Sequence, residues 1–185
     1  VDYLPVDKSG MINIEDLKNM ISKKTSLVSV MFGNNEVGTI QPISEITKIC
    51  HENNVFFHTD AVQAVGKLPV DVKKLDVDLL SISSHKLYGP KGVGALYIKD
   101  GVKIDPMILG GGQEFRLRSG TENVASIVGF GQACEIAQNH LIENISLVKK
   151  LQTILVKKVL DEIPEVTFNG HSESRLSNNA HFTFL

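Results

Sequence analysis

Three polar clusters in this sequence combine side chains that could do chemistry together. Each cluster directly follows a short apolar segment. The clusters are Asn34-Asn35-Glu36, Asp60-Ala61-Val62-Gln63 and Ser83-Ser84-His85-Lys86. In open α/β sheets, ligands bind beyond the carboxyl ends of the parallel strands. If the three apolar segments are neighbouring parallel strands, amide, carboxylate, hydroxyl, imidazole and amine groups meet at one edge. Each cluster alone has a simpler explanation, as a turn, a helix N-cap or a loop.

Lys86 has the most specific chemistry of these residues. It follows a buried apolar strand and lies beside His85, so it is not placed like an ordinary surface charge. Burial and neighbouring cations favour the neutral amine, which can form a Schiff base with an aldehyde. Pyridoxal phosphate (PLP) is the common aldehyde cofactor. It needs a lysine, an acid beside its pyridine nitrogen and donors for its phosphate.

The same clusters supply the other groups that PLP needs. Asp60 would keep the ring nitrogen protonated by placing an anion beside it. The hydroxyl groups of Ser83 and Ser84 would bind the phosphate. Asn35 and Gln63 would hydrogen-bond the phenolic oxygen of the ring.

Helices and strands alternate along the chain and must position these clusters. Helical spacing and capping residues predict helices over 14–21 (capped by Asn13), from Ser44 to about 53, from 123 to 137, and around 148–159, ended by Pro164. Apolar runs predict strands at 27–32, 55–59, 78–82, 95–98, 166–168 and 180–185. The run at 27–32 is typical of a strand buried on both faces. This order predicts an α/β fold with a mainly parallel sheet.

Composition excludes several classes of protein. The chain has 185 residues, of which 42% are hydrophobic, so a packed core is expected and intrinsic disorder is not. A net charge of -2 argues against direct nucleic-acid binding. No apolar run is long enough to span a bilayer. Cys50 and Cys134 lie in helical stretches, which predicts two buried thiols and a cytoplasmic protein, with an organelle left open.

Four stretches together resemble the cysteine desulfurases, PLP enzymes of the aspartate-aminotransferase fold type. They are Asn34–Gly38, His58–Lys67, Ser83–Gly92 and Gly110–Asn123. The resemblance extends over essentially the whole chain. It implies that 1–140 form part of the PLP-binding large domain. It also implies that 141–185 form a linking helix and the beginning of a smaller α+β C-terminal domain.

The resemblance also implies a role for each residue of the site. Lys86 is similar to the Schiff-base lysine and Asp60 to the partner of the pyridine nitrogen. Gln63 and Asn35 correspond to ligands of the ring oxygen, and Asn35 also lies near the substrate carboxylate. The phosphate ligands would be Ser83 and His85, together with Thr121, which family members lend to the other subunit of a homodimer, whereas Ser84 stands where some members carry Gly or Ala. No metal site is expected.

The family reaction removes sulfur from L-cysteine, leaves L-alanine and forms an enzyme-bound persulfide. The sulfur then passes to an acceptor or scaffold protein for iron–sulfur cluster assembly, or to tRNA thiolation. The nucleophilic cysteine of the family matches neither Cys50 nor Cys134. The chain also opens without Met and closes on an apolar strand-like segment. We therefore expect a fragment that is inactive on its own.

Four other interpretations remain open, one of them another PLP enzyme of the same fold, such as an aminotransferase. Selenocysteine lyase uses the same scaffold. A non-haem iron site could use His58, Asp60 and His85, which have the ligand types of a two-His-one-carboxylate centre. Finally, the chain could be a folded scaffold piece that binds no cofactor.

Overall fold

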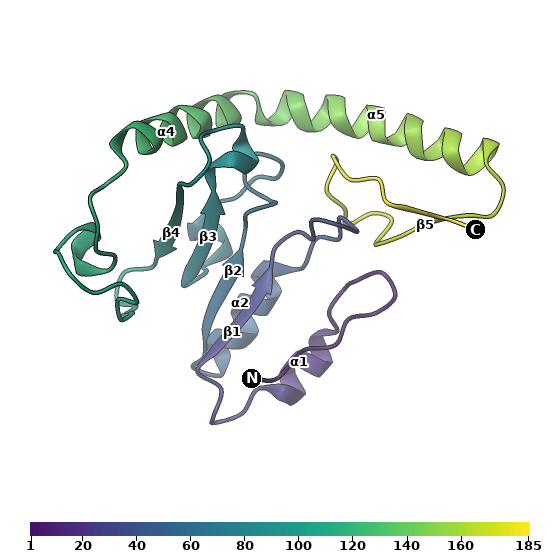
Figure 1. Cartoon of the computed structure of the whole chain (residues 1–185). Helices are drawn as coiled ribbons and strands as arrows, with labels where there is room; N and C mark the ends of the chain where they lie inside the picture. The colour runs from purple at the N-terminus through teal and green to yellow at the C-terminus, as the bar shows by residue number, and fades with distance from the viewer.

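The computed structural model describes the whole chain, Val1–Leu185, and contains two β-sheets (Figure 1). The larger sheet has four strands in the order β1 (Leu27–Met31), β2 (Phe56–Asp60), β3 (Leu79–Ser83) and β4 (Gly94–Ile98). β1, β2 and β3 run parallel, and β4 pairs antiparallel with β3. The predicted α/β fold with a mainly parallel sheet is confirmed.

Five α-helices and two 3-10 helices connect or cover the strands. They are α1 (Ile14–Met20), α2 (Ile43–Glu52), α3 (Val72–Leu75), η1 (Ser84–Leu87), η2 (Glu114–Arg116), α4 (Val124–Asn139) and α5 (Leu141–Glu162). β5 (Val166–Phe168) and β6 (Phe182–Phe184) form the second sheet as an antiparallel pair. None of the helices combines the length and the apolar character that crossing a membrane requires.

The helix ends follow the capping pattern of the sequence with one exception. Asn13 caps α1, because its side chain accepts the N–H of Glu15 at 2.8 Å. α5 ends just before Pro164, as predicted. The prediction that Ser44 caps α2 is wrong. That helix begins at Ile43, and Pro42 stands at the N-cap, where its side chain forms no hydrogen bond. The proline ring restricts φ to a value that is compatible with the start of a helix, so the helix begins here without a side-chain cap.

The hydrophobic core lies between α2 and one face of the large sheet. Phe57 and Leu80 on that face pack with Ile46 and Ile49 of α2, and all four are buried. The opposite face is open in this chain: Leu27, Phe56 and Leu96 are 47%, 50% and 45% exposed. The prediction that 27–32 is buried on both faces is therefore wrong. β1 is an edge strand, and the core covers only one of its faces.

α4 and α5 lie end to end along one side of the molecule, with a break at His140 (Figure 1). α4 packs on η1, where Phe130 and Ala133 meet Leu87 in a small buried cluster. α5 packs on β5. The break falls at the predicted boundary between residues 140 and 141, and the division into two domains stays a prediction.

Candidate functional site

The carboxyl ends of β1, β2 and β3 lie at the same edge of the sheet, because the strands are parallel neighbours. Met31, Asp60 and Ser81 are register partners on the three strands. β3 continues for two residues beyond Ser81, so its carboxyl end at Ser83 lies roughly 6–7 Å further along the strand direction than Asp60. η1, which carries Lys86, follows at once. The three polar clusters therefore follow neighbouring parallel strands, as predicted, and the roles of their residues stay predictions.

The open face of the sheet is polar next to this edge. Side chains alternate along a strand, so Asp60, His58 and Ser81 share that face. The imidazole of His58 bridges two hydroxyl groups, with Nδ1 2.7 Å from Ser29 Oγ and Nε2 2.9 Å from Ser81 Oγ. Burial lowers the pKa of His58, and the nearby charge of Asp60 opposes this shift. The neutral ring is thus favoured.

Asp60 is held in a defined orientation by the turn that follows it. Its Oδ1 accepts the N–H of Val62 at 2.9 Å, and its second oxygen forms no hydrogen bond within the chain. The turn is anchored by Ala61 and Ala64, which are fully buried and joined by a backbone hydrogen bond of 2.9 Å. Gln63 lies in this turn and accepts a hydrogen bond from Lys67 Nζ at 2.9 Å.

η1 carries Ser84, His85 and Lys86 of the third cluster, and Ser83 directly precedes it at the end of β3. Ser83 Oγ lies 2.8 Å from His85 Nδ1, so the hydroxyl and the imidazole act as a pair. Lys86 is half-buried and forms no ion pair with a carboxylate of this chain. Its positive charge is close enough to Lys67 to help lower the pKa of that second lysine, after burial as the larger cause.

Ser84 lies in the same cluster but its side chain is enclosed. The residue is 0% exposed, and its hydroxyl has no hydrogen-bond partner. It packs against Gly89, where an added Cβ would lie 2.3 Å from Ser84 Oγ and 3.0 Å from Ala133 of α4. The hydroxyl is enclosed on this side and has no partner within the chain, and the phosphate contact of Ser84 stays a prediction.

Asn35 and Thr121 lie on loops and are both exposed. The turn that holds Asn35 is shaped by its neighbour Asn34, whose Oδ1 accepts the N–H groups of Glu36 at 2.8 Å and Val37 at 2.9 Å. Thr121 precedes α4, and no hydrogen bond joins it to another predicted site residue.

Residues 174–176, far along the chain, form hydrogen bonds with the loop that follows the Asn34–Asn35 turn. Ile40 donates to the carbonyl of Ser174 at 2.8 Å, and Leu176 donates to the carbonyl of Gly38 at 2.9 Å. Between them lies Arg175, which is buried and has its guanidinium 3.9 Å from the ring centroid of Phe168. Arg175 thereby connects the loop that follows Asn35 with Phe168 of the second sheet.

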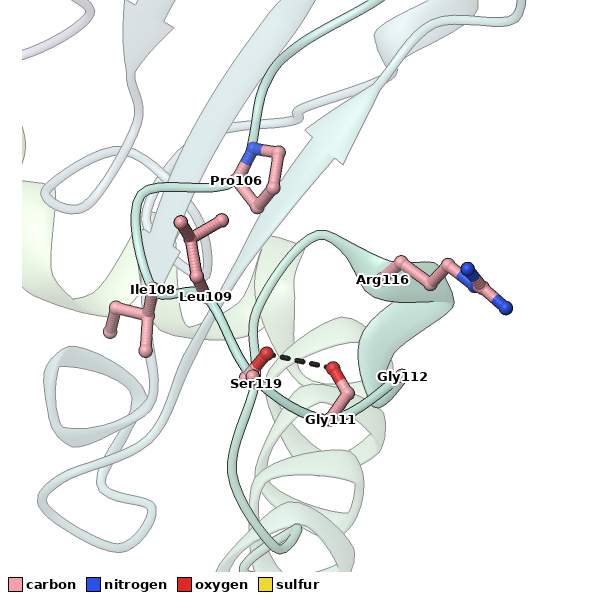
Figure 2. Close-up of a pocket in the computed structure, with 8 residues that line it drawn as sticks. Pro106, Ile108, Leu109, Gly111, Gly112, Arg116 and Ser119 are labelled. Atoms are coloured by element: carbon pink, nitrogen blue, oxygen red, sulfur yellow. Dashed lines mark hydrogen bonds between the residues drawn. The ribbon is translucent and has the colours of Figure 1, made fainter.

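The glycine-rich loop after β4 forms a cavity of about 280 Å³, shown in Figure 2. Ser119 Oγ donates to the carbonyl of Gly111 at 2.7 Å across the loop, while the side chain of Arg116 points away from the other labelled residues. Glu114, Phe115 and Arg116 all have positive φ, which is uncommon for residues other than glycine. None of the predicted site residues lines this cavity.

Sequence reasoning missed two residues that contact the site. Lys67 stands four residues after Gln63, and this i,i+4 spacing could have indicated their contact. The sequence pattern indicates a direct role for His58 only as an iron ligand. Both of its ring nitrogens instead pair with serines, and no group of three or more His, Cys, Asp or Glu residues could hold a metal. The iron alternative thus has no support.

Two curated relatives match the full length of this chain. A cysteine desulfurase IscS from Clostridium botulinum is 54% identical over 187 residues, covering 100% of this chain and 47% of the relative. A mitochondrial cysteine desulfurase from Arabidopsis thaliana is 48% identical over 186 residues, covering 100% of this chain and 41% of the relative. The chain thus spans about half the length of the curated relatives it matches.

Solved structures share both the fold and part of the sequence. A NifS-like protein superposes with a TM-score of 0.94 at 44% identity, over 99% of this chain and 50% of that protein. A second structure, SspA in complex with cysteine, has a TM-score of 0.83 at 36% identity, over 100% of this chain and 51% of that protein. The family model described as aminotransferase class-V matches residues 1–185. The chain therefore belongs to the aminotransferase class-V family.

Proposed function

We propose that this sequence carries the lysine–aspartate part of the active site of a PLP-dependent cysteine desulfurase. The proposed reaction converts L-cysteine to L-alanine and transfers the sulfur to an enzyme cysteine as a persulfide. The family is PLP-dependent, and relatives about half identical to the chain are named cysteine desulfurases. The observation that carries the proposal is the half-buried Lys86, without a carboxylate partner, directly beyond the strand edge that bears Asp60.

The polar atoms at this edge fit PLP, because several of them have no partner within the chain. The free oxygen of Asp60 suits a protonated pyridine nitrogen. The free Nε2 of Gln63 suits the ring oxygen, with Asn35 as a second ligand near the substrate carboxylate. Ser83 and His85 suit the phosphate. Ser84, whose buried hydroxyl has no partner within the chain, stays a predicted third phosphate ligand.

When bound, PLP supplies an electron-withdrawing ring that is conjugated with the amine of the substrate. The residues of the chain do the rest. Asp60 holds the proton on the ring nitrogen. Lys86 holds the cofactor and then moves protons at the substrate, a role that suits a lysine without a carboxylate partner.

We propose that the sulfur acceptor is a cysteine other than Cys50 and Cys134. Burial, followed by the charge of Asp78, raises the pKa of Cys50 to about 11. Burial also raises the pKa of Cys134. A thiolate is the nucleophilic form of cysteine, and both environments disfavour it.

The proposed partners follow from the same assignment. We propose a homodimer in which the exposed Thr121 contributes to the phosphate site of the second subunit. We also propose an acceptor or iron–sulfur scaffold protein that takes the sulfur. We place the protein in the cytoplasm, and the matching relatives also include mitochondrial enzymes.

The test measures alanine and sulfide released from L-cysteine by the intact protein that carries this sequence, with PLP and a thiol reductant present. We expect activity that Lys86→Ala abolishes together with the visible absorbance of bound PLP. The control is Lys74→Ala, which removes a lysine whose side chain is 85% exposed on α3 and leaves both readouts unchanged. An intact protein that binds no PLP and releases no sulfide would overturn the proposal. Release of selenium from L-selenocysteine alone would favour the lyase.

A further inference from the structure

Lys67 is a half-buried cation whose only side-chain hydrogen bond goes to an amide. Its Nζ donates to Gln63 Oε1 at 2.9 Å, and no carboxylate of the chain forms an ion pair with it. Burial lowers the pKa of Lys67, and the positive charge of Lys86 lowers it further. Burying an ammonium group without a carboxylate partner costs free energy, so the position of Lys67 calls for an explanation.

The contact fixes which end of the Gln63 amide faces Lys67. A lysine ammonium has three donors and no acceptor, so it can pair only with the amide oxygen. The two N–H groups on Nε2 are then left to point elsewhere, and they form no hydrogen bond within the chain. Gln63 therefore presents a donor to the site instead of an acceptor.

The backbone holds this pair rigidly against η1. Lys67 donates its N–H to the carbonyl of Ala64 at 2.9 Å. Its neighbour Gly66 has a φ of 77° and lies so close to η1 that an added Cβ would be 2.3 Å from Leu87 Cδ2. This packing brings the turn that bears Gln63 and Lys67 against the helix that bears Lys86.

We propose that Lys67 is a positioning residue that orients the Gln63 amide so that its N–H groups serve the ring oxygen of PLP. This inference rests on the proposed function, because it assumes that PLP occupies this edge. A negatively polarised oxygen needs a donor, and a freely rotating amide would offer it an acceptor part of the time. The charge of Lys67 adds a second effect, since it favours the deprotonated form of a group bound nearby.

The experiment uses the intact protein and measures two quantities in Lys67→Met: the dissociation constant for PLP and the pH midpoint of the visible PLP band. We expect the dissociation constant to rise about 10- to 100-fold, the size of losing one hydrogen bond to a charged group. We expect the pH midpoint to move upward, because a positive charge has been removed. Lys67→Arg should restore both quantities, and Lys74→Met serves as the exposed control.

A double-mutant cycle with Gln63→Ala separates positioning from a general loss of stability. If Lys67 acts through Gln63, Lys67→Met changes the dissociation constant much less in the Gln63→Ala background. Additive effects, or a Lys67→Met protein that binds PLP like the wild type with an unchanged pH midpoint, would overturn the inference alone. A wild-type protein that binds no PLP would overturn the proposed function and this inference together. A variant that unfolds is recognised by circular dichroism, and Lys67→Arg then decides: loss of PLP affinity in a folded Lys67→Arg counts against positioning.

Discussion

The two faces of the four-stranded sheet differ in burial and polarity, although successive residues of each strand point to opposite faces. Phe57 is 0% exposed against α2, while its neighbour Phe56 on the other face is 50% exposed. The packed face consists mainly of apolar side chains that fill the core, with the buried Thr59 among them. The open face carries Asp60 and the Ser29–His58–Ser81 bridge. The packed face thus stabilises the sheet, and the stable sheet holds the polar groups of the open face in place.

The largest expected effect is on the packed face. Phe57→Ala should lower the free energy of unfolding of this chain by about 3–5 kcal/mol, because it leaves a cavity in the core. Phe56→Ala is the matched control and should lower it by less than about 1 kcal/mol, since its ring is already half in solvent. Denaturant titration monitored by circular dichroism measures both. Equal losses in the two variants would show that the faces do not differ as described.

The second effect concerns the open face. Asp60→Asn should lower cysteine desulfurase activity of the intact protein on the order of 10²-fold, because it removes a fixed charge beside the reacting group. The amide can still accept the N–H of Val62, so the free energy of unfolding should hardly change. Steady-state kinetics and denaturant titration test this separation. An active Asp60→Asn enzyme would remove the carboxylate from the proposed site.

The third effect concerns the thiol of Cys50, which lies on α2 in the core that covers the packed face. The pKa of Cys50, raised to about 11, predicts alkylation by iodoacetamide about 100-fold slower at pH 8 than that of an ordinary thiol. Unfolding in denaturant should abolish the protection. Peptide mass spectrometry after timed labelling follows this. Fast labelling of Cys50 in the folded protein, or a persulfide on it after turnover, would contradict its exclusion as the sulfur acceptor.

The smallest effect is a pH dependence on the open face. The pKa of His58 is lowered in the folded protein, so below its ordinary value of about 6.5 the unfolded chain takes up a proton that the folded chain resists. Stability should therefore fall as the pH drops below about 6.5, and His58→Gln should reduce this slope. Denaturant titrations of both proteins at several pH values give the difference. An unchanged slope in His58→Gln would show that another group is responsible.

The sequence allowed the order of elements and the shared edge to be predicted, because both follow from local patterns. Asn13 is a side-chain cap, and the parallel arrangement follows from strand–helix alternation. The open face could not be predicted from the run at 27–32, since an apolar run does not reveal what covers it. Ser44 is of a residue type that commonly caps helices, and sequence alone does not show that Pro42 stands at the N-cap instead.

Within the site, residue types were predictable but orientations were not. The three clusters indicated an amine, an acid and donors at one edge, and the topology agrees. Ser83 and Ser84 are identical in type, yet only packing against Gly89 shows that the second hydroxyl is enclosed. The clasp of Arg175 near the Asn35 turn joins segments far apart in the chain, which no local pattern reveals.

The most direct test of the central claim is to trap the lysine that carries PLP. The intact protein is loaded with PLP, reduced with borohydride, digested and analysed by peptide mass spectrometry. A stable phosphopyridoxyl group on Lys86 is the predicted result, with the neighbouring Lys67 unmodified. A label on another lysine, or no label at Lys86 in a folded protein, would contradict the assignment of this sheet edge as the cofactor site.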